Sequence, residues 1–386
     1  MGIAPNKTAG SLIKIVDAWA VDTPSIIAVE SGAGEYTYAD LKTFSDAVAE
    51  NLLAAGILPG DVVAMYLPRI KEVWPVVLGI FKAGGTYLPL DIDWPKERVS
   101  AILSQADCQN VVVASTTFDH PGVSFFSFQS LLARASGCVP AHLPTNNSAY
   151  IIFTSGSTGA PKGVEISHES LIHLLTEMGG LLGVDSTLRQ LCITAFSFDL
   201  VIPDLFLPLV FGGCCVLTEN KDVRFLPALL NDKNINLLQA TPSTYRRLID
   251  LHWSGRDELV AVIGGDKVEP ALADALVTRV ASVWHCYGPT ETTVWAAINQ
   301  HFQGGSLGFS DALPGYQFYL VDNEGELLTK AGDKGELLIG GLGVALGYVG
   351  DLEQTAKSFL DCLIFVPSYA SNVGVSVNSR NYLRGV

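Results

Sequence analysis

The sequence predicts an α/β fold of stacked layers, followed by a smaller β-rich part. Short apolar, β-branched segments alternate with segments of helical periodicity, which is typical of layered α/β proteins. The alternation stops near Pro314, where strand-like segments follow one another without helices between them. The 386 residues are 48% hydrophobic, which is enough to bury the core of two or three lobes.

The predicted strands are short and apolar on both faces, as expected for strands covered on both sides. They lie at 62–66, 111–113, 150–153, 191–193, 215–217, 237–238 and 260–263. Helical patterns separate them at 44–55, 97–105, 169–177, 243–251 and 270–280. Several begin with a cap residue or an early proline, as at Thr241 and Pro242, which favours a helix start there.

The last part of the chain has a different pattern. Segments 317–321 and 336–339 are typical of strands, and the residues from Asp322 to Gly325 are typical of a tight turn. We therefore expect one core over residues 12–360, with its β-rich part from about 314. Residues 361–386 lack helical periodicity, and we expect a divergent tail of unknown structure.

Composition excludes several classes of function. The chain has 39 acidic and 24 basic residues, so its net charge of −15 is the wrong sign for a nucleic-acid partner. The longest apolar run, 205–217, is interrupted by Pro208 and is shorter than the roughly 20 residues that span a bilayer. The 7 cysteines lack disulfide or metal spacing, so we expect small buried groups in a reducing compartment. These observations predict a cytoplasmic protein without a membrane partner.

The strongest chemical signal is the segment 153–163, Phe-Thr-Ser-Gly-Ser-Thr-Gly-Ala-Pro-Lys-Gly, directly after an apolar strand. Glycines let backbone N–H groups converge on an anion, hydroxyls add donors, and Lys162 supplies a positive charge. The spacing matches neither GxxxxGK[ST] nor GxGxxG. A flexible Ser/Gly linker has a similar composition, but the preceding strand and the embedded Pro-Lys-Gly favour a polyphosphate-binding loop.

Around this loop the sequence resembles the adenylate-forming superfamily, and within it the adenylation domains of nonribosomal peptide synthetases. The resemblance extends from about Trp19 to Phe359. Six segments are similar to the family's core motifs, in family order, at 36–41, 81–91, 153–163, 196–199, 287–291 and 335–348. The resemblance implies the large N-terminal lobe of an acyl-adenylate-forming enzyme.

In this family a carboxylate attacks the α-phosphate of ATP and pyrophosphate leaves, so ATP and Mg²⁺ are the implied cofactors. The implied catalytic residues are Thr154, Lys162 and Glu291, and Glu291 is also the implied Mg²⁺ ligand. The implied nucleotide contacts are Thr154, Ser155, Gly156, Ser157, Thr158, Gly159, Lys162, Gly264, His285, Tyr287, Gly288 and Thr290, with Tyr287 stacked on adenine. Taken alone, 287–289 is an ordinary turn and Glu291 a solvated acid at a helix entry; the phosphate loop favours the functional interpretation.

Asp199 lies among apolar residues, where a carboxylate is costly unless a positive group satisfies it. A structural ion pair is one explanation. The match to the fourth motif implies the other, that Asp199 holds the α-ammonium of an amino-acid substrate. Carrying over the family's pocket positions implies a side-chain site lined by Leu200, Pro203, Ala240, Ala261, Ile263, Cys286, Val294 and Trp295. The apolar lining predicts a hydrophobic substrate.

The resemblance fails at the end of the chain. Family members continue to a Tyr-Arg-Thr-Gly-Asp segment and a C-terminal lobe with a catalytic lysine, whereas residues 362–386 are not family-like. We therefore expect a truncated domain whose turnover is impaired; in the complete family a phosphopantetheine carrier domain is the partner. Two alternatives stay open. One is an acyl- or aryl-CoA ligase, against which Asp199 argues, and the other is a non-catalytic nucleotide-binding remnant.

Overall fold

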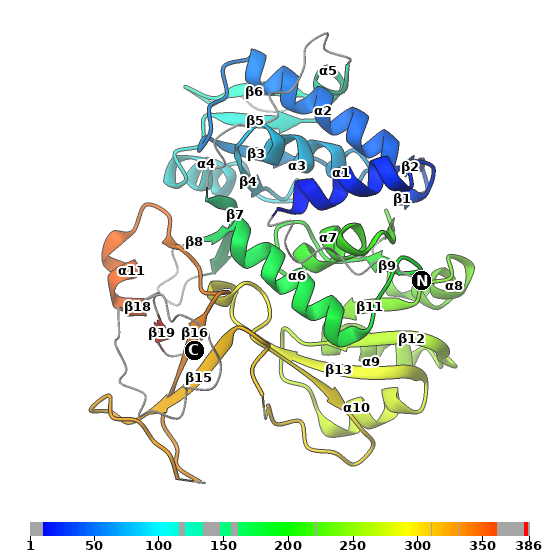
Figure 1. Cartoon of the computed structure of the whole chain (residues 1–386), viewed down its shortest axis with the longest axis vertical. Coiled ribbons are helices and arrows are strands. Elements are labelled where there is room, and N and C mark those ends of the chain that lie inside the picture. The colour runs from blue at the N-terminus through cyan, green and yellow to red at the C-terminus, as the bar shows by residue number, and fades with distance from the viewer. Residues whose placement is uncertain are drawn as a thin grey trace.

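The computed structural model describes residues 11–115, 120–133, 147–155, 161–220, 222–309, 311–330, 332–360 and 382–384. Within these ranges two large sheets and one small sheet are arranged among α-helices (Figure 1). Both large sheets combine with helices, and the small sheet follows them in the chain. The predicted α/β layers and the β-rich part after them are therefore confirmed.

The first large sheet has eight strands in the order β14-β13-β12-β11-β9-β10-β1-β2. Its strands are β1 Ile27–Ser31, β2 Gly34–Thr37, β9 Arg189–Cys192, β10 Cys214–Leu217, β11 Leu237–Ala240, β12 Arg256–Ile263, β13 Val280–Tyr287 and β14 Ala297–His301. All neighbours are parallel except the two edge strands β2 and β14. Because parallel strands end at the same edge of a sheet, the segments after β9, β11, β12 and β13 emerge on one side.

The second large sheet has seven strands in the order β17-β8-β7-β4-β3-β5-β6. Its strands are β3 Val62–Tyr66, β4 Thr86–Pro89, β5 Asn110–Val113, β6 Ser124–Ser127, β7 Ser148–Ser155, β8 Pro161–Ser167 and β17 Gly347–Tyr348. The strands from β7 to β6 are parallel, whereas β8 and β17 add to one edge in antiparallel fashion. This edge carries the predicted phosphate-binding segment.

Helices cover both sheets. They are α1 Leu12–Asp22, α2 Tyr38–Ala54, α3 Val73–Lys82, α4 Lys96–Gln105, α5 Phe128–Leu132, α6 His168–Leu182, α7 Val201–Phe211, α8 Leu226–Asp232, α9 Pro242–Asp250, α10 Pro270–Val277 and α11 Leu352–Ser358, with the short 3₁₀ turns η1 Val223–Phe225 and η2 Thr290–Thr292. The largest core joins α1, α2, α3, α6 and α7 to both sheets. On the outer faces, α8, α9 and α10 cover the eight-stranded sheet and α4 covers the seven-stranded sheet.

One shifted helix end and one unpredicted helix differ from the sequence-based expectation for tertiary reasons. The helix expected over 270–280 ends at Val277, because Val280 begins β13 and pairs with β12. Helix α7 was not predicted at all. Every one of its residues is buried in the layer between the two sheets, so it has no polar face and shows no amphipathic period.

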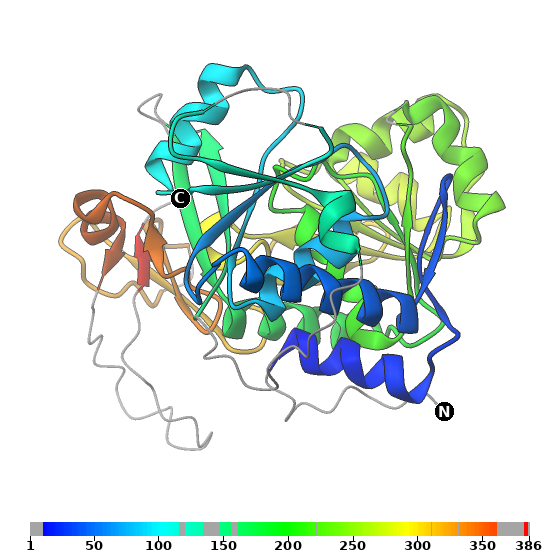
Figure 2. The same ribbon diagram turned by 90° about the horizontal axis from the view of Figure 1, so that it is seen from above.

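The small sheet is antiparallel and has the order β15-β16-β19-β18. Its strands are β15 Tyr316–Val321, β16 Glu336–Gly341, β18 Phe359–Leu360 and β19 Tyr382–Arg384. Both views place this sheet, coloured orange and red, at one side of the two large sheets (Figures 1 and 2). The strands expected at 317–321 and 336–339 are confirmed. Of the expected tail 361–386, only 382–384 are described, and they form β19.

Two further expectations concern membrane spans and cysteines. Within the described ranges, none of the helices combines the length and the apolar character needed to cross a membrane. The described cysteines, Cys108, Cys192, Cys214, Cys215 and Cys286, are buried and have free thiols. For these five the expectation of small buried groups is confirmed.

Candidate active site

The predicted phosphate-binding segment joins two antiparallel strands. Thr154 on β7 pairs with Lys162 on β8, and Ser155 pairs with Pro161. The hairpin therefore brings the first hydroxyl residue and the lysine of the segment opposite each other. Gly156, Ser157, Thr158 and Gly159, which the sequence analysis assigned to the phosphates, lie outside the described residues, as does the side chain of Ser155.

Tyr348 links Lys162 to Glu291. The Lys162 Nζ lies 5.2 Å from the centre of the Tyr348 ring, and the Tyr348 hydroxyl donates a hydrogen bond of 2.7 Å to Glu291 Oε1. Burial and the negative charge of Glu291 raise the pKa of Tyr348, so the phenol stays protonated and donates. Sequence reasoning placed Tyr348 in a motif but gave it no role. Tyr348 lies on β17, which pairs with the strand β8 that carries Lys162, and this position reveals its role.

The position of β17 explains why these groups meet. The backbone N–H groups of Leu346 and Val349 donate to the carbonyl oxygens of Glu165 and Gly163, each at 2.8 Å. On the other side, the N–H of Ala345 donates to the carbonyl oxygen of Glu291, also at 2.8 Å. The segment 345–349 therefore ties η2 to β8 and holds the carboxylate near the lysine.

Glu291 is half-buried and is the predicted ligand for Mg²⁺. Among the described residues, no group of three or more histidine, cysteine or acidic side chains is placed to hold a metal. Mg²⁺ in nucleotide sites usually takes only one or two carboxylates and completes its coordination with phosphate oxygens and water. A single carboxylate, oriented by Tyr348 through one of its two oxygens, fits that requirement.

Asp199 is buried, with 8% of its surface exposed, and Thr290 Oγ1 donates a hydrogen bond of 2.5 Å to its Oδ2. Burial raises the pKa of Asp199 to about 6; the hydrogen bond from Thr290 opposes this, and the nearby Glu291 carboxylate adds to it. In the described part of the chain, no cation forms an ion pair with Asp199. The structure therefore gives no support to a structural ion pair at this position. Thr290, expected at the nucleotide, contacts this carboxyl.

The predicted side-chain pocket is divided by the eight-stranded sheet. Cys286, Val294 and Trp295 belong to the core of the inner helical layer, with Leu200 packed against it. Pro203, on α7, is buried in the same layer. Ala240, Ala261 and Ile263 lie on the other face of the sheet, in the core formed with α8, α9 and α10. The structure does not bring these three to Asp199, because successive side chains of a strand point to opposite faces.

The strand residues that face the inner layer are instead Gln239 on β11 and Val262 on β12. Val262 belongs to the inner core, and Gln239 Oε1 accepts a hydrogen bond of 2.9 Å from the indole Nε1 of Trp295. Sequence reasoning missed both. The polar Gln239 within an apolar strand could have signalled its own position, whereas the strand of Val262 is apolar on both faces and carries no such mark.

Two of the predicted nucleotide residues, His285 and Tyr287, lie on β13 and share one neighbour. The ring of Phe309 is 4.4 Å from His285 and 5.3 Å from the half-buried Tyr287, measured between ring centres. Burial lowers the pKa of His285, so its imidazole is neutral at physiological pH. The aromatic group expected at adenine therefore belongs to a cluster of three rings.

Gly264 and Gly288 allow close approach of the segment that carries Trp295. A Cβ on Gly264 would lie 2.6 Å from Cη2 of Trp295, and one on Gly288 would lie 2.4 Å from the carbonyl oxygen of Val294. Real Cβ atoms do not approach other atoms so closely, and any side chain at either position would displace Trp295. Both glycines were expected at the nucleotide; the neighbours that a Cβ would meet belong to Cys286 and to the segment 294–296.

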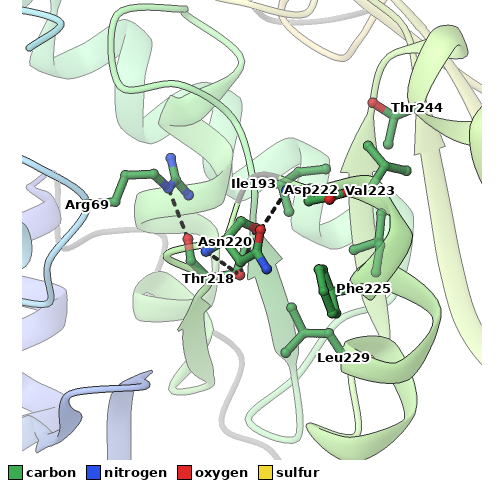
Figure 3. A pocket seen from close by; sticks show the side chains of 10 residues that line it. Arg69, Ile193, Thr218, Asn220, Asp222, Val223, Phe225, Leu229 and Thr244 are labelled. Carbon is green, nitrogen blue, oxygen red and sulfur yellow. Dashed lines mark hydrogen bonds between the residues drawn. The ribbon is translucent and has the colours of Figure 1, made fainter. Parts of the chain in front are cut away.

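A cavity of about 110 Å³ lies where β9 and β10 end, with Ile193 and Thr218 in its lining (Figure 3). Arg69 points to its rim and donates to the carbonyl oxygens of Thr218, Thr194 and Cys192 at 3.0, 2.6 and 2.7 Å. Its guanidinium also lies 5.0 Å from the Phe196 ring centre. None of the predicted site residues lines the cavity. Arg69 therefore anchors the ends of β9 and β10 and the segment that leads to Asp199.

Comparisons with known proteins agree with this geometry. The AMP-binding enzyme family profile matches residues 16–349. A dimodular nonribosomal peptide synthase of Bacillus subtilis is 31% identical over 377 residues, covering 92% of this chain and 16% of that protein. Bacitracin synthase 3 of Bacillus licheniformis is 30% identical over 369 residues, covering 92% of this chain and 6% of that protein. The chain thus spans a small part of these relatives.

Solved structures give the same result. A four-domain nonribosomal peptide synthetase, holo-AB3403 bound to AMP and glycine, superposes with a TM-score of 0.83 at 30% identity, covering 100% of this chain and 30% of that one. The N-terminal subdomain of NpsA from Klebsiella oxytoca gives 0.84 at 22% identity, covering 97% and 95%, and supports the fold alone. The chain therefore belongs to the AMP-binding enzymes of the adenylate-forming superfamily, as an adenylation domain of the nonribosomal peptide synthetase type.

Proposed function

We propose that this domain activates the carboxylate of a hydrophobic amino acid with ATP and Mg²⁺, forming an aminoacyl-adenylate. A carboxylate oxygen of the amino acid forms a bond to the α-phosphorus of ATP. The bond between that phosphorus and the bridging oxygen of the β-phosphate breaks, and pyrophosphate leaves with the electron pair. In the complete assembly, a phosphopantetheine thiol on a carrier domain would receive the acyl group.

The observation that carries the proposal is the state of Asp199. Its carboxyl is buried, accepts hydrogen bonds only from neutral groups, the Thr290 hydroxyl and backbone N–H groups, and has no cation paired with it among the described residues. An ionised carboxylate in such a place is costly unless a positive group neutralises it. The α-ammonium of an amino acid supplies that charge, whereas a fatty or aryl acid has none to offer.

Electrostatics explain the roles of the remaining groups. Two anions, the substrate carboxylate and the triphosphate, must approach each other, so positive charge and donors around the phosphates lower the barrier most. Lys162 and Thr154 would hold the phosphates from the β7–β8 hairpin. Mg²⁺, when bound at Glu291, would neutralise the phosphate charge. Tyr348 would orient Glu291 for that role through its hydrogen bond of 2.7 Å.

The lining of the pocket supports a hydrophobic side chain. Leu200, Val262, Cys286, Val294 and Trp295 are all apolar and belong to the inner core or pack against it. Gln239 is polar, but it is engaged with Trp295, Leu200 and Asp204. A charged or strongly polar side chain would find no partner there and would lose its hydration.

Binding of non-hydrolysable acyl-adenylate analogues tests the proposal. Isothermal titration calorimetry with aminoacyl sulfamoyl-adenosines should give saturable binding for at least one apolar amino acid. The matched control is the same analogue without its amino group, which we expect to bind roughly 100-fold more weakly, as for the loss of one buried charge partner. Binding of aryl or fatty-acyl analogues without binding of any aminoacyl analogue would refute the role of Asp199.

A further inference from the structure

A buried polar chain lies behind the acyl pocket, between α7 and the strands β9 and β11. We call it the Asp204 relay and define it as Asp204, Gln190, Thr194, Gln239 and Trp295. Asp204 has 0% of its surface exposed, although it is a carboxyl group in a helix whose other residues are all apolar or proline. Buried charges of this kind are costly and need a specific set of partners.

Three side chains donate hydrogen bonds to Asp204. Thr194 Oγ1 donates to Oδ2 at 2.7 Å, while Gln190 Nε2 and Gln239 Nε2 donate to Oδ1 at 2.9 and 3.2 Å. Burial raises the pKa of Asp204 to about 7, and the bonds from Thr194 and Gln190 oppose that rise. An ionised carboxylate accepts hydrogen bonds and cannot donate them. At pH 8 Asp204 is therefore mainly an acceptor for its three neighbours.

The acceptor character of Asp204 determines the orientation of the Gln239 amide. With Nε2 turned to Asp204 and to the carbonyl oxygen of Leu200 at 2.5 Å, Oε1 faces the indole N–H of Trp295 at 2.9 Å. The flipped amide would place its oxygen against a carboxylate and its NH₂ group against an N–H donor. Both contacts would be repulsive, and the indole can only donate. One orientation of Gln239, and with it one partner for Trp295, is thus selected.

The backbone before Trp295 is also held in an unusual conformation. Thr293 and Val294 have φ angles of 58° and 67°, a region that β-branched residues rarely adopt. Thr293 Oγ1 donates to the carbonyl oxygen of Gly343 at 2.6 Å, and the N–H of Trp295 donates to the carbonyl oxygen of Thr293 at 2.8 Å. Backbone strain of this kind persists only where surrounding contacts over-determine it, and it clusters at functional sites. Trp295 is thus held both at its indole N–H, by Gln239, and at its backbone.

We propose that Asp204 is a positioning residue for the acyl pocket, which acts through the Gln239 amide to hold the indole of Trp295 as a fixed wall against the substrate side chain. The same amide holds the carbonyl of Leu200, the residue after Asp199. The relay therefore connects Asp199, the proposed partner of the substrate ammonium, to Trp295, the proposed wall of the pocket. This inference rests on the proposed function, because it takes the side chain next to Trp295 to be that of an amino-acid substrate.

Gln190 offers a matched control for a spectroscopic test. Gln190 and Gln239 are buried on neighbouring strands and donate to the same oxygen of Asp204, but only Gln239 contacts Trp295. The ¹⁵N–¹H spectrum at pH 8 should show indole signals from the 6 tryptophans, and the signal lost in Trp295→Phe identifies Trp295. We expect Asp204→Leu, which removes the acceptor of the Gln239 amide, and Gln239→Leu to shift that signal upfield, as a lost hydrogen bond does, while Gln190→Leu leaves it in place.

Ligand discrimination gives the second readout. Calorimetry with alanyl, valyl, leucyl and phenylalanyl sulfamoyl-adenosines defines the preference of the wild-type chain. In Asp204→Leu and Gln239→Leu, the affinity for the preferred analogue should fall about tenfold, the effect of one buried hydrogen bond, and the differences in affinity among the four analogues should become smaller. Gln190→Leu should keep the ranking.

The outcomes separate the two proposals. If the wild-type chain binds none of the four analogues, the proposed function fails. If it binds them, and Asp204→Leu leaves both the Trp295 signal and the ranking as in Gln190→Leu, the relay is refuted. Should Asp204→Leu not fold, Gln239→Leu decides alone: an unshifted Trp295 signal in that variant refutes the relay in the same way.

Discussion

Two buried carboxyl groups, Asp199 and Asp204, lie five positions apart at the start of α7 and differ in how fully they are satisfied. Asp204 receives hydrogen bonds from Thr194, Gln190 and Gln239. Asp199 receives one side-chain bond, from Thr290, in addition to backbone N–H groups. Burial raises the pKa of Asp199 to about 6 and that of Asp204 to about 7. A raised pKa therefore does not tell the two groups apart; their side-chain partners do.

The difference shows how a structural carboxyl can be told from one that awaits a ligand. A fully partnered acid in a protein interior is part of the architecture, because its removal leaves several donors unpaired. An acid with unused acceptor capacity and no cation is incomplete by itself. Perturbed pKa values are common at both kinds of position, so the geometry must decide between them.

The largest predicted effect is on stability, when the carboxyl of Asp204 is removed. We expect Asp204→Ala to lower the free energy of unfolding by about 3–5 kcal/mol, because three buried donors lose their acceptor. Urea unfolding followed by circular dichroism measures this. Asp222→Ala is the control: Asp222 pairs with Arg224 at the surface, and its loss should lower the free energy of unfolding far less. Equal losses of unfolding free energy in Asp204→Ala and Asp222→Ala would show that Asp204 stabilises the fold no more than a surface carboxylate does.

Removing the Asp199 carboxyl should weaken ligand binding and, unlike the loss of Asp204, should not destabilise the fold. We expect Asp199→Asn to weaken the preferred aminoacyl sulfamoyl-adenosine roughly 100-fold, since the buried ammonium loses its charge partner. At pH 8 the unliganded variant should be more stable than wild type by about 2 kcal/mol, because a carboxylate whose pKa burial raises to about 6 is costly when ionised.

The analogue without an amino group provides the control for this variant. Its affinity should differ little between wild type and Asp199→Asn, because it carries no ammonium. If the variant weakened both analogues equally, Asp199 would be supporting the pocket and not the amino group.

The pH dependence of binding sharpens the same comparison. The pKa of Asp199 is raised to about 6 in the free domain, and a bound ammonium would lower it again. The ionised form therefore binds better, so affinity should be level above pH 7 and fall by up to tenfold per pH unit below 6. Without ligand, the stability of the fold changes with pH in the opposite direction. Folded Asp199 holds its proton more tightly than the unfolded chain does, so the free energy of unfolding falls as pH rises from about 4 to 6. Calorimetry in Asp199→Asn should show no such step.

The smallest predicted effect concerns the nucleotide side. Tyr348→Phe removes the hydroxyl that donates to Glu291 but keeps the ring beneath Lys162. We expect the Mg²⁺ concentration for half-maximal ATP binding to rise about three- to tenfold, the effect of one hydrogen bond to a carboxylate. Binding of ATP without Mg²⁺ should stay unchanged. Tyr319→Phe, on the exposed part of β15, serves as the control and should alter neither.

Much of the fold and part of the site could be predicted from the sequence. The apolar strands and their helices are local patterns, and the pairing of Thr154 with Lys162 follows from a short hairpin. The burial of Asp199 followed from its apolar neighbours. Ala240, Ala261 and Ile263 were misplaced because an apolar strand covered on both sides gives no sign of which face is which.

The sequence by itself determined the family, the layered α/β order and the chemical types at the site, because motifs and periodicity are properties of short segments. Only the tertiary structure decided which side chains meet. Tyr348 lies beside Lys162 because β17 pairs with β8, and Gln239 meets both Asp204 and Trp295 because α7 packs against the eight-stranded sheet. Such contacts join residues far apart in the chain, and their partners depend on the register and packing of whole elements, which no local pattern specifies.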